Sequence, residues 1–89
     1  MYFVYVLFCA DGKLYIGYST NIQRRLEEHL SGRVKSTCHR RPVRLFYYEQ
    51  YCNQRDAKAR EIFLKSGAGH QQLKRQHQHQ LAQFGYKYL

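Results

Sequence analysis

Two short apolar runs open the chain, with a turn signal between them. Residues 2–8, YFVYVLF, are an unbroken run of β-branched and aromatic residues, which is typical of a strand buried on both faces at the centre of a small sheet. An Asp-Gly pair at residues 11–12 is the strongest short-range signal for a β-hairpin. The pattern therefore predicts that residues 13–19, KLYIGYS, return antiparallel to the first strand. Tyr5 and Tyr15 then lie on neighbouring strands, and whether they share a face depends on the register, which the pattern leaves open.

A helical pattern follows the hairpin. Residues 21–32, NIQRRLEEHLSG, begin at a capping residue, end at a glycine and predict a helix of about three turns. Its apolar residues recur at every fourth position: Ile22, Leu26 and Leu30. Arg25 and His29 also stand four residues apart, on a stripe beside the apolar one, so they are neighbours at the edge of the packed surface. A solvated face is the alternative for this pair, because charged side chains are rarely buried.

Basic side chains dominate residues 33–42, RVKSTCHRRP, which have little apolar content. This segment is predicted to be a loop whose charges and hydroxyls suit contacts with phosphate, and a solvated basic loop is the alternative. Pro42 ends the loop. Alternating side chains in residues 43–51, VRLFYYEQY, then predict a third strand.

A second helix is predicted after this strand. Asn53 can cap a helix over residues 53–67, NQRDAKAREIFLKSG, which Gly67 and Gly69 are expected to close. Its apolar residues are Ala57, Ala59, Ile62 and Phe63. Glu61 lies among them, and three basic residues are close enough along the helix to neutralise it: Lys58, Arg60 and Lys65.

A third, weaker helical pattern covers residues 70–83. Its stripe continues to the following phenylalanine and consists of Leu73, His77, Leu81 and Phe84. These elements together predict an α+β fold, in which a small three-stranded antiparallel sheet is flanked by two to three helices. At this length we expect a single domain over residues 1–89.

The net charge of the chain indicates which class of molecule it binds. The chain has 15 Lys and Arg but 6 Asp and Glu, a net charge of +9. The expected partner is therefore a polyanion, with nucleic acid first and an anionic membrane surface second. No apolar stretch approaches the roughly 20 residues of a membrane span, and no signal-peptide pattern opens the chain, so a cytoplasmic location is expected. The odd set of Cys9, Cys38 and Cys52, without a CxxC pair, favours reduced thiols.

Five sequence features, in order along the chain, resemble the signature of the GIY-YIG nuclease superfamily. Residues 3–5, FVY, stand where the family has GIY, and residues 15–17 are YIG itself. Arg25 follows the second tyrosine by ten residues, and His29 follows four residues later. Glu61 stands at the position of the family's helical glutamate. The match covers most of the chain. The chain is similar to the small stand-alone branch of the superfamily, whose members consist of a GIY-YIG domain alone.

The resemblance implies a divalent-metal-dependent endonuclease that hydrolyses phosphodiester bonds, with DNA as the expected substrate and repair or recombination as the setting. Glu61 would hold one Mg²⁺ or Mn²⁺ ion together with water and substrate phosphate, and no small-molecule cofactor is expected. Arg25 would hold the phosphate through two parallel donors, and His29, with an ordinary pKa of about 6.5, would support proton transfer. Tyr5 and Tyr15 would supply hydroxyls, with Tyr5 nearer the attacking water. The expected nucleic-acid contacts are Arg24, Arg33, Lys35, Arg40 and Arg41.

A module that binds nucleic acid without cleaving it is the alternative function. The family often carries an asparagine in its closing segment, where this chain has Leu73 and a stretch rich in Gln and His. The combination of both tyrosines, the arginine, the histidine and the glutamate favours cleavage, because binding alone gives no chemical reason to combine them. Neither the choice between DNA and RNA nor the oligomeric state follows from the sequence, since phosphate contacts carry no base information.

Overall fold

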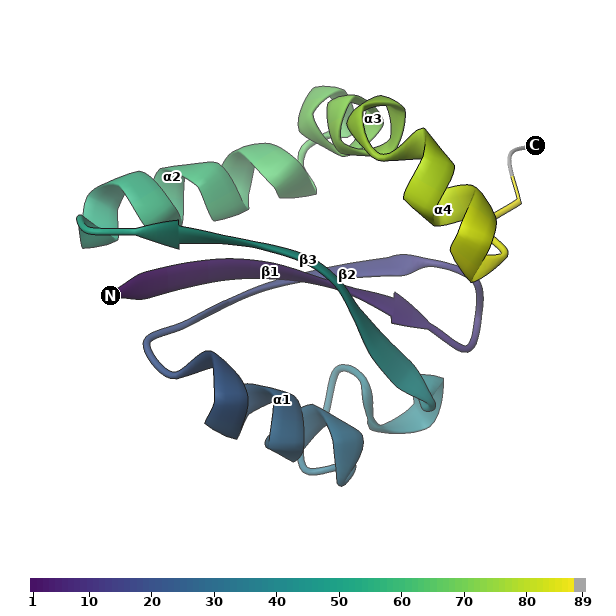
Figure 1. The fold of residues 1–89 in the computed structure, drawn as a ribbon. Coiled ribbons are helices and arrows are strands. Elements are labelled where there is room, and N and C mark those ends of the chain that lie inside the picture. Colours follow the sequence, from purple (N-terminus) through teal and green to yellow (C-terminus); the bar gives the residue numbers. More distant parts are fainter. Residues whose placement is uncertain (88–89) are drawn as a thin grey trace.

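Three antiparallel strands form one sheet in the order β2-β1-β3 (Figure 1). The computed structural model describes residues 1–87, so residues 88–89 of the predicted domain lie outside the described part. The strands are β1 (Tyr2–Cys9), β2 (Leu14–Ser19) and β3 (Val43–Tyr51). Both the hairpin and the central position of the first strand are confirmed.

A β-bulge interrupts the pairing of β1 with β3. Val6 lies opposite Tyr47, but its neighbour Leu7 lies opposite Leu45, so Phe46 is the additional residue. Phe46 and Tyr47 consequently both contact His77, with ring centroids 5.5 Å and 4.2 Å from the imidazole. The strict alternation predicted for this strand is therefore wrong at its middle.

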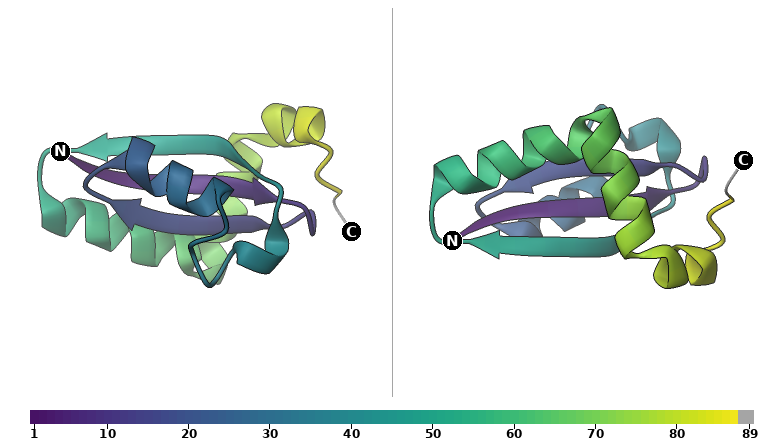
Figure 2. Two further views of the ribbon diagram at one scale, coloured as in Figure 1. Left: turned by 90° about the horizontal axis from the view of Figure 1, so that it is seen from below. Right: turned by 90° about the horizontal axis from the view of Figure 1, so that it is seen from above.

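Helices cover both faces of the sheet, in three layers (Figures 1 and 2). Helix α1 (Ile22–Leu30) lies on one face, and α2 (Gln54–Lys65), α3 (Gly67–Gln76) and α4 (Gln78–Phe84) lie on the other. The core under α2–α4 consists of Val4, Val6, Leu14, Ile16, Phe46, Ala57, Leu64, Leu73 and Leu81. The smaller core under α1 contains Tyr5, Leu7, Cys9 and Val43. The predicted α+β class and antiparallel sheet are confirmed, with four α-helices within residues 1–87 instead of two to three.

Helix α1 begins where the cap signal predicts, because the Asn21 side chain accepts a hydrogen bond from the Arg24 amide. Its buried stripe differs from the prediction. Leu30 is 59% exposed, whereas His29 is fully buried. The predicted core residue Leu30 is therefore wrong. His29 can be buried in its place because its imidazole forms hydrogen bonds with two buried hydroxyl groups, described below.

Ser66, not a glycine, separates α2 from α3. Its hydroxyl donates to the Phe63 carbonyl and accepts from the Gly69 amide, so it ends one helix and caps the next. Gly69 must lack a side chain, because a Cβ there would overlap the Phe63 carbonyl. On α2 the buried residues are Ala57 and Leu64, while the expected core residues Ile62 and Phe63 are 70% and 37% exposed.

The predicted third helix is two helices that meet at His77. The predicted stripe is correct, since Leu73 and Leu81 are fully buried and Phe84 is half-buried. The break redirects the chain so that Phe84 reaches Phe8, at a centroid distance of 5.7 Å. Within residues 1–87, no helix is long and apolar enough to cross a membrane.

Candidate functional site

The strand register places the two tyrosines on one face. Tyr5 lies opposite Gly17 and Leu7 lies opposite Tyr15, and residues two apart on a strand share a face. Both tyrosines therefore face α1. Their ring centroids are 6.4 Å apart, and each ring contacts His29 of α1 at 5.5 Å and 5.2 Å.

The absence of a side chain at Gly17 leaves space for the Tyr5 ring on the neighbouring strand. A Cβ at Gly17 would overlap Cζ and Oη of Tyr5, so the ring passes directly over this glycine. Because β2 is an edge strand, the Tyr5 hydroxyl is directed toward that edge of the sheet. The glycine of the YIG run is thus required by close approach of the tyrosine on the neighbouring strand.

A buried chain of hydrogen bonds connects three elements. Tyr5 Oη lies 2.7 Å from Nε2 of His29, and His29 Nδ1 lies 2.7 Å from Oγ1 of Thr37. Tyr5 is 1% exposed, and His29 and Thr37 are fully buried. Thr37 comes from the segment 33–42, so this segment is not a simple solvated loop. It also contains buried Val34 and a short 3₁₀ helix, Cys38–Arg40.

Burial keeps both members of the Tyr5–His29 pair neutral. It lowers the pKa of His29 to about 4, and the positive charge of Arg25 acts in the same direction, against a smaller opposing effect of Glu28. Burial also raises the pKa of Tyr5 to about 12, although a hydrogen-bonding interaction with Arg25 acts to lower it. The expectation of a histidine that titrates near neutral pH is therefore wrong, because the ring lies out of contact with water.

Tyr15 presents the more accessible hydroxyl. It is half-buried, and its oxygen accepts a hydrogen bond of 3.3 Å from Ser36 on the exposed side of the molecule. The family resemblance implies that Tyr5 lies nearer an attacking water. The burial of the two side chains favours Tyr15 for contact with a substrate or a water molecule.

Arg25 lies beside this pair, at the rim of the site. Its side chain is 36% exposed, and Nη1 donates to Glu28 at a distance of 3.0 Å. This bond, together with the interaction with Tyr5, raises the pKa of Arg25 further above its ordinary value. The guanidinium is thus permanently charged, held on one side by Glu28 and open to solvent on the other.

Glu61 approaches the site from the opposite helical layer. Helix α2 packs against β1 and β2, and the negative charge of Glu61 contributes to raising the pKa of Tyr5 after the larger effects of burial and Tyr15. The carboxylate is therefore within electrostatic range of the tyrosine that crosses Gly17. Its ion-pair partner is Lys65, at 3.1 Å. The other expected neighbours act elsewhere, since Arg60 binds Glu49 and Lys58 lies over the Tyr18 ring.

Glu61 offers a metal ion one carboxylate and little else from the protein. Among residues 1–87, no group of three or more His, Cys, Asp or Glu side chains is arranged to bind a metal. The Glu61 side chain is 15% exposed, and the side chain of its partner Lys65 is 55% exposed. A hard oxygen ligand at the margin of solvent fits a Mg²⁺ or Mn²⁺ ion that takes its remaining ligands from water and phosphate.

The five basic residues expected to bind nucleic acid differ in their exposure and in their contacts with other residues. Arg40 is paired with Asp11 at 2.8 Å and joins the basic segment to the hairpin. Arg41 donates to the Cys38 carbonyl. The most exposed members of the set are Arg24, Arg33, Lys35 and Arg41.

Sequence reasoning missed three residues of the site: Glu28, Ser36 and Thr37. Glu28 holds Arg25 through an i, i+3 ion pair that the helical spacing could have indicated. Ser36 and Thr37 bond to Tyr15 and His29 across 21 and 8 residues of chain, and no periodic pattern marks them.

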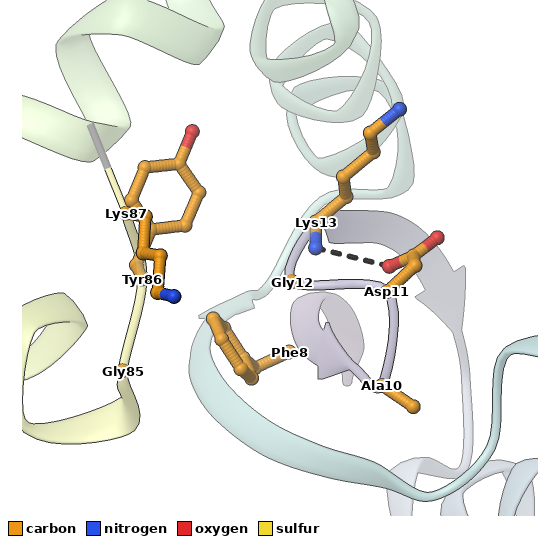
Figure 3. Close-up of a pocket in the computed structure, with 8 residues that line it drawn as sticks. All are labelled: Phe8, Ala10, Asp11, Gly12, Lys13, Gly85, Tyr86 and Lys87. Carbon is orange, nitrogen blue, oxygen red and sulfur yellow. Dashed lines mark hydrogen bonds between the residues drawn. The ribbon is translucent and has the colours of Figure 1, made fainter. Parts of the chain in front are cut away.

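A pocket of about 520 Å³ lies at the other side of the hairpin, between the β1–β2 turn and the chain after α4 (Figure 3). Its lining includes Phe8, Lys13, Tyr86 and Lys87. Neither tyrosine of the cluster lines this pocket, and neither do Arg25, His29 and Glu61, so the pocket does not coincide with the tyrosine cluster.

Comparison with known proteins identifies the family of the chain. The GIY-YIG catalytic domain matches residues 1–81. A UPF0213 protein of Pediococcus acidilactici is 42% identical over 76 residues, which cover 82% of this chain and 78% of that protein. A UPF0213 protein of Bacillus pumilus is 46% identical over 66 residues, covering 73% and 67% of the two chains.

One solved structure gives the same result. The solution NMR structure of a UPF0213 protein from Bacillus halodurans matches with a TM-score of 0.53 and 36% identity, over 82% of each chain. The sequence match, the shared fold and the clustered tyrosines lead to one conclusion: the chain belongs to the GIY-YIG catalytic domain family, a nuclease superfamily, and resembles its UPF0213 members.

Proposed function

We propose that this protein is a divalent-metal-dependent endonuclease that hydrolyses phosphodiester bonds of DNA in the cytoplasm, in repair or recombination. The observation that carries the proposal is that Tyr5 and Tyr15 share a face of the sheet, where both rings contact His29 and Arg25 lies beside them. Arg25 and His29 come from the helix on one face, and Glu61 comes from the helix on the other. The net charge of +9 supports a polyanionic substrate.

Arg25 is the residue proposed to hold the scissile phosphate. Its guanidinium is charged at any relevant pH and offers two parallel donors to phosphate oxygens. Glu28 fixes its orientation without covering it. Arg25 would therefore stabilise the negative charge that develops on the phosphoryl oxygens during cleavage.

Glu61 is the residue proposed to hold Mg²⁺ or Mn²⁺. When bound, such an ion polarises the phosphate and lowers the pKa of a coordinated water. Lys65 must leave the carboxylate for a cation to bind, and this costs little, because the lysine is largely exposed and an i, i+4 helix pair contributes about 0.3–0.5 kcal/mol.

The two tyrosines are proposed to have different roles. Tyr15, with the accessible hydroxyl, would contact the phosphate or orient the water. Tyr5 is buried and neutral and accompanies His29, so its hydroxyl is held in one place at the edge of the sheet. Orientation of this kind lowers the barrier because the reacting groups are already in place before the substrate binds.

A DNA digest tests the proposal. Supercoiled and branched DNA are incubated with the protein in Mg²⁺, in Mn²⁺ and in EDTA, and we expect cleavage with either metal and none in EDTA. Glu61→Gln and Arg25→Ala should each lower the cleavage rate at least about a hundredfold. The exposed residues Glu27 and Arg75 supply charge-matched controls, Glu27→Gln and Arg75→Ala, which should cleave at the wild-type rate.

Wild-type cleavage by the Glu61 variant, or undiminished cleavage in EDTA, would contradict the proposed metal role. Among residues 1–87, no group of three or more possible metal ligands is gathered, and this favours a second candidate, a module that binds DNA or RNA without cleaving it. Binding without product in every divalent metal tried would support that candidate instead.

A further inference from the structure

We propose that the pocket between the hairpin and the end of α4 binds one unpaired nucleotide of a DNA strand. The base lies against Phe8 and Tyr86, and the phosphate lies near Lys13 and Lys87. The role of this pocket in selecting a form of DNA rests on the proposed endonuclease function, whereas binding itself requires no cleavage.

One wall of the pocket is the hairpin, which is fixed to the segment before β3. The Ala10 amide donates to the Arg40 carbonyl at 2.9 Å, and the Arg40 guanidinium pairs with Asp11 at 2.8 Å. Asp11 also accepts a hydrogen bond from the Lys13 amide at 3.0 Å (Figure 3). This wall is therefore held in place before any ligand binds.

The opposite wall is the chain that leaves α4. Gly85 ends the helix in the left-handed region, with a φ of 88°. The Gly85 amide donates to the Ala82 carbonyl and the Tyr86 amide donates to the Leu81 carbonyl, which are the two hydrogen bonds of a Schellman motif. The backbone of Tyr86 is thus fixed relative to the helix.

Two aromatic rings provide a surface on which a base can stack. Phe8 and Tyr86 both line the pocket, with ring centroids 6.5 Å apart and an angle of 68° between the planes. Phe84 packs edge-on against Phe8 at 5.7 Å, which restricts the motion of that ring. Both lining rings are half-buried, so part of each remains accessible. Aromatic side chains stack with every nucleobase, because each base has a π-face.

Positive charge lies on both walls. Lys13 belongs to the hairpin and Lys87 follows Tyr86, and both lysines are exposed. Among residues 1–87, no carboxylate forms an ion pair with either amino group. The acidic residue of the lining, Asp11, has its charge offset by Arg40. Two cations beside aromatic rings suit a ligand that combines a phosphate with a base.

The chemistry of the pocket favours an unpaired nucleotide. A base within a duplex is stacked on both faces and paired along its edge, so it must leave the helix before it can stack on a side chain. The volume of about 520 Å³ lies in the usual range of small-molecule pockets, about 300–1,000 Å³. Lys13 precedes Tyr15 by two residues, at most about 7 Å of chain. A strand held in the pocket therefore passes near the tyrosine cluster.

Fluorescence anisotropy in EDTA tests the site without cleavage. A labelled blunt duplex is compared with the same duplex carrying a short oligothymidine tail. We expect the tailed duplex to bind at least about fivefold more tightly, because one stacked base changes affinity by about 5- to 150-fold. Tyr86→Ala should remove this preference without changing the affinity for the blunt duplex, while Tyr86→Phe should keep it. The matched control is Tyr48→Ala, an exposed tyrosine on the face that carries α1, which should keep the preference.

The lysines are tested through the salt dependence of binding. Lys13→Ala and Lys87→Ala should each weaken binding of the tailed duplex and lower the slope of log affinity against log salt concentration by about 0.7, the value for one phosphate of a single strand. Arg75→Ala is the control and should leave the slope unchanged. Equal affinity of the wild type for the two duplexes, or a tail preference that survives Tyr86→Ala, would overturn the proposal.

Amide NMR of the wild-type protein keeps the test independent of how the variants fold. A short oligothymidine should shift the signals of residues 12–13 and 85–87, and shifts confined to other residues would overturn the proposal. Tighter binding of thymidine monophosphate than of the oligomer would mean that the ligand is a free nucleotide, which would overturn the assignment to a strand. A protein that prefers tails but never cleaves loses the proposed endonuclease function and keeps this site. A protein that cleaves without a tail preference loses only this site.

Discussion

At the scale of single residues, the glycine of the YIG motif, Gly17, is required by a contact between two strands. The Tyr5 ring occupies the space where any other residue at position 17 would place its Cβ. Tyr5 in turn meets His29 at hydrogen-bonding distance. Position 17 therefore controls the placement of a hydroxyl that belongs to another strand.

Gly17→Ala should destabilise the protein by about 1–3 kcal/mol, because the added methyl forces the buried Tyr5 ring out of its place. Urea unfolding at pH 7 measures the change. The matched control is Gly67→Ala, at the start of α3, where a Cβ meets nothing within 4 Å. That control should be neutral or slightly stabilising, because alanine reduces the freedom of the unfolded chain. Equal effects of the two substitutions would mean that the overlap with Tyr5 is relieved without cost.

At the scale of elements, a carboxylate joins β3 to α2. Glu49 accepts hydrogen bonds from Tyr47 and Tyr51 on its own strand, at 2.7 Å and 2.6 Å. Arg60 of α2 adds a bidentate pair at 2.9 Å and 3.0 Å. Burial tends to raise the pKa of Glu49, but these donors outweigh it and hold the pKa below its ordinary value. This link positions α2, and with it Glu61, against the sheet.

Glu49→Gln should cost about 1–3 kcal/mol of unfolding free energy at pH 7, because two tyrosines and an arginine lose a charged acceptor. A lowered pKa in the folded state means that this stabilisation is present above about pH 4.5 and is lost as the pH falls through the folded value. The difference between wild type and variant should therefore shrink in acid. Urea unfolding at pH 7 and below pH 4 measures it, with the exposed Glu27→Gln as control. A pH-independent difference would contradict a role for the charge.

At the scale of the whole molecule, some basic residues are held in ion pairs and others are exposed on the surface. Arg40 and Arg60 are used in ion pairs that join elements. Lys35 and Arg33 lie exposed on the segment that begins after α1 and reaches the tyrosine cluster through Ser36 and Thr37. The exposed basic residues nearest the site, rather than the net charge, should determine how a polyanion is oriented on the protein.

Lys35→Ala should weaken DNA binding and lower the slope of log affinity against log salt concentration by about 0.9, the loss of one phosphate contact. Fluorescence anisotropy with a labelled duplex, at salt concentrations from low to physiological, measures both quantities. Arg75→Ala removes one charge from α3, on the far side of the sheet, and should leave the slope unchanged. If both variants lower it equally, the protein attracts DNA by its overall charge alone.

Sequence by itself determined the elements and the order of the chemical groups. The hairpin, the caps at Asn21 and Asn53 and the central first strand depend on signals within a few residues, so they could be predicted. The tyrosines, Arg25, His29 and Glu61 were recognised from their order along the chain. None of this required knowledge of which segments meet.

Only the tertiary structure decided which side chains share a space. It buried His29 in place of Leu30, directed Thr37 inward from a basic segment, and placed Glu61 in the helical layer opposite α1. Such outcomes depend on register, on a bulge and on packing between residues far apart in the chain. Hydrophobic periodicity describes one element at a time and carries no information about these contacts.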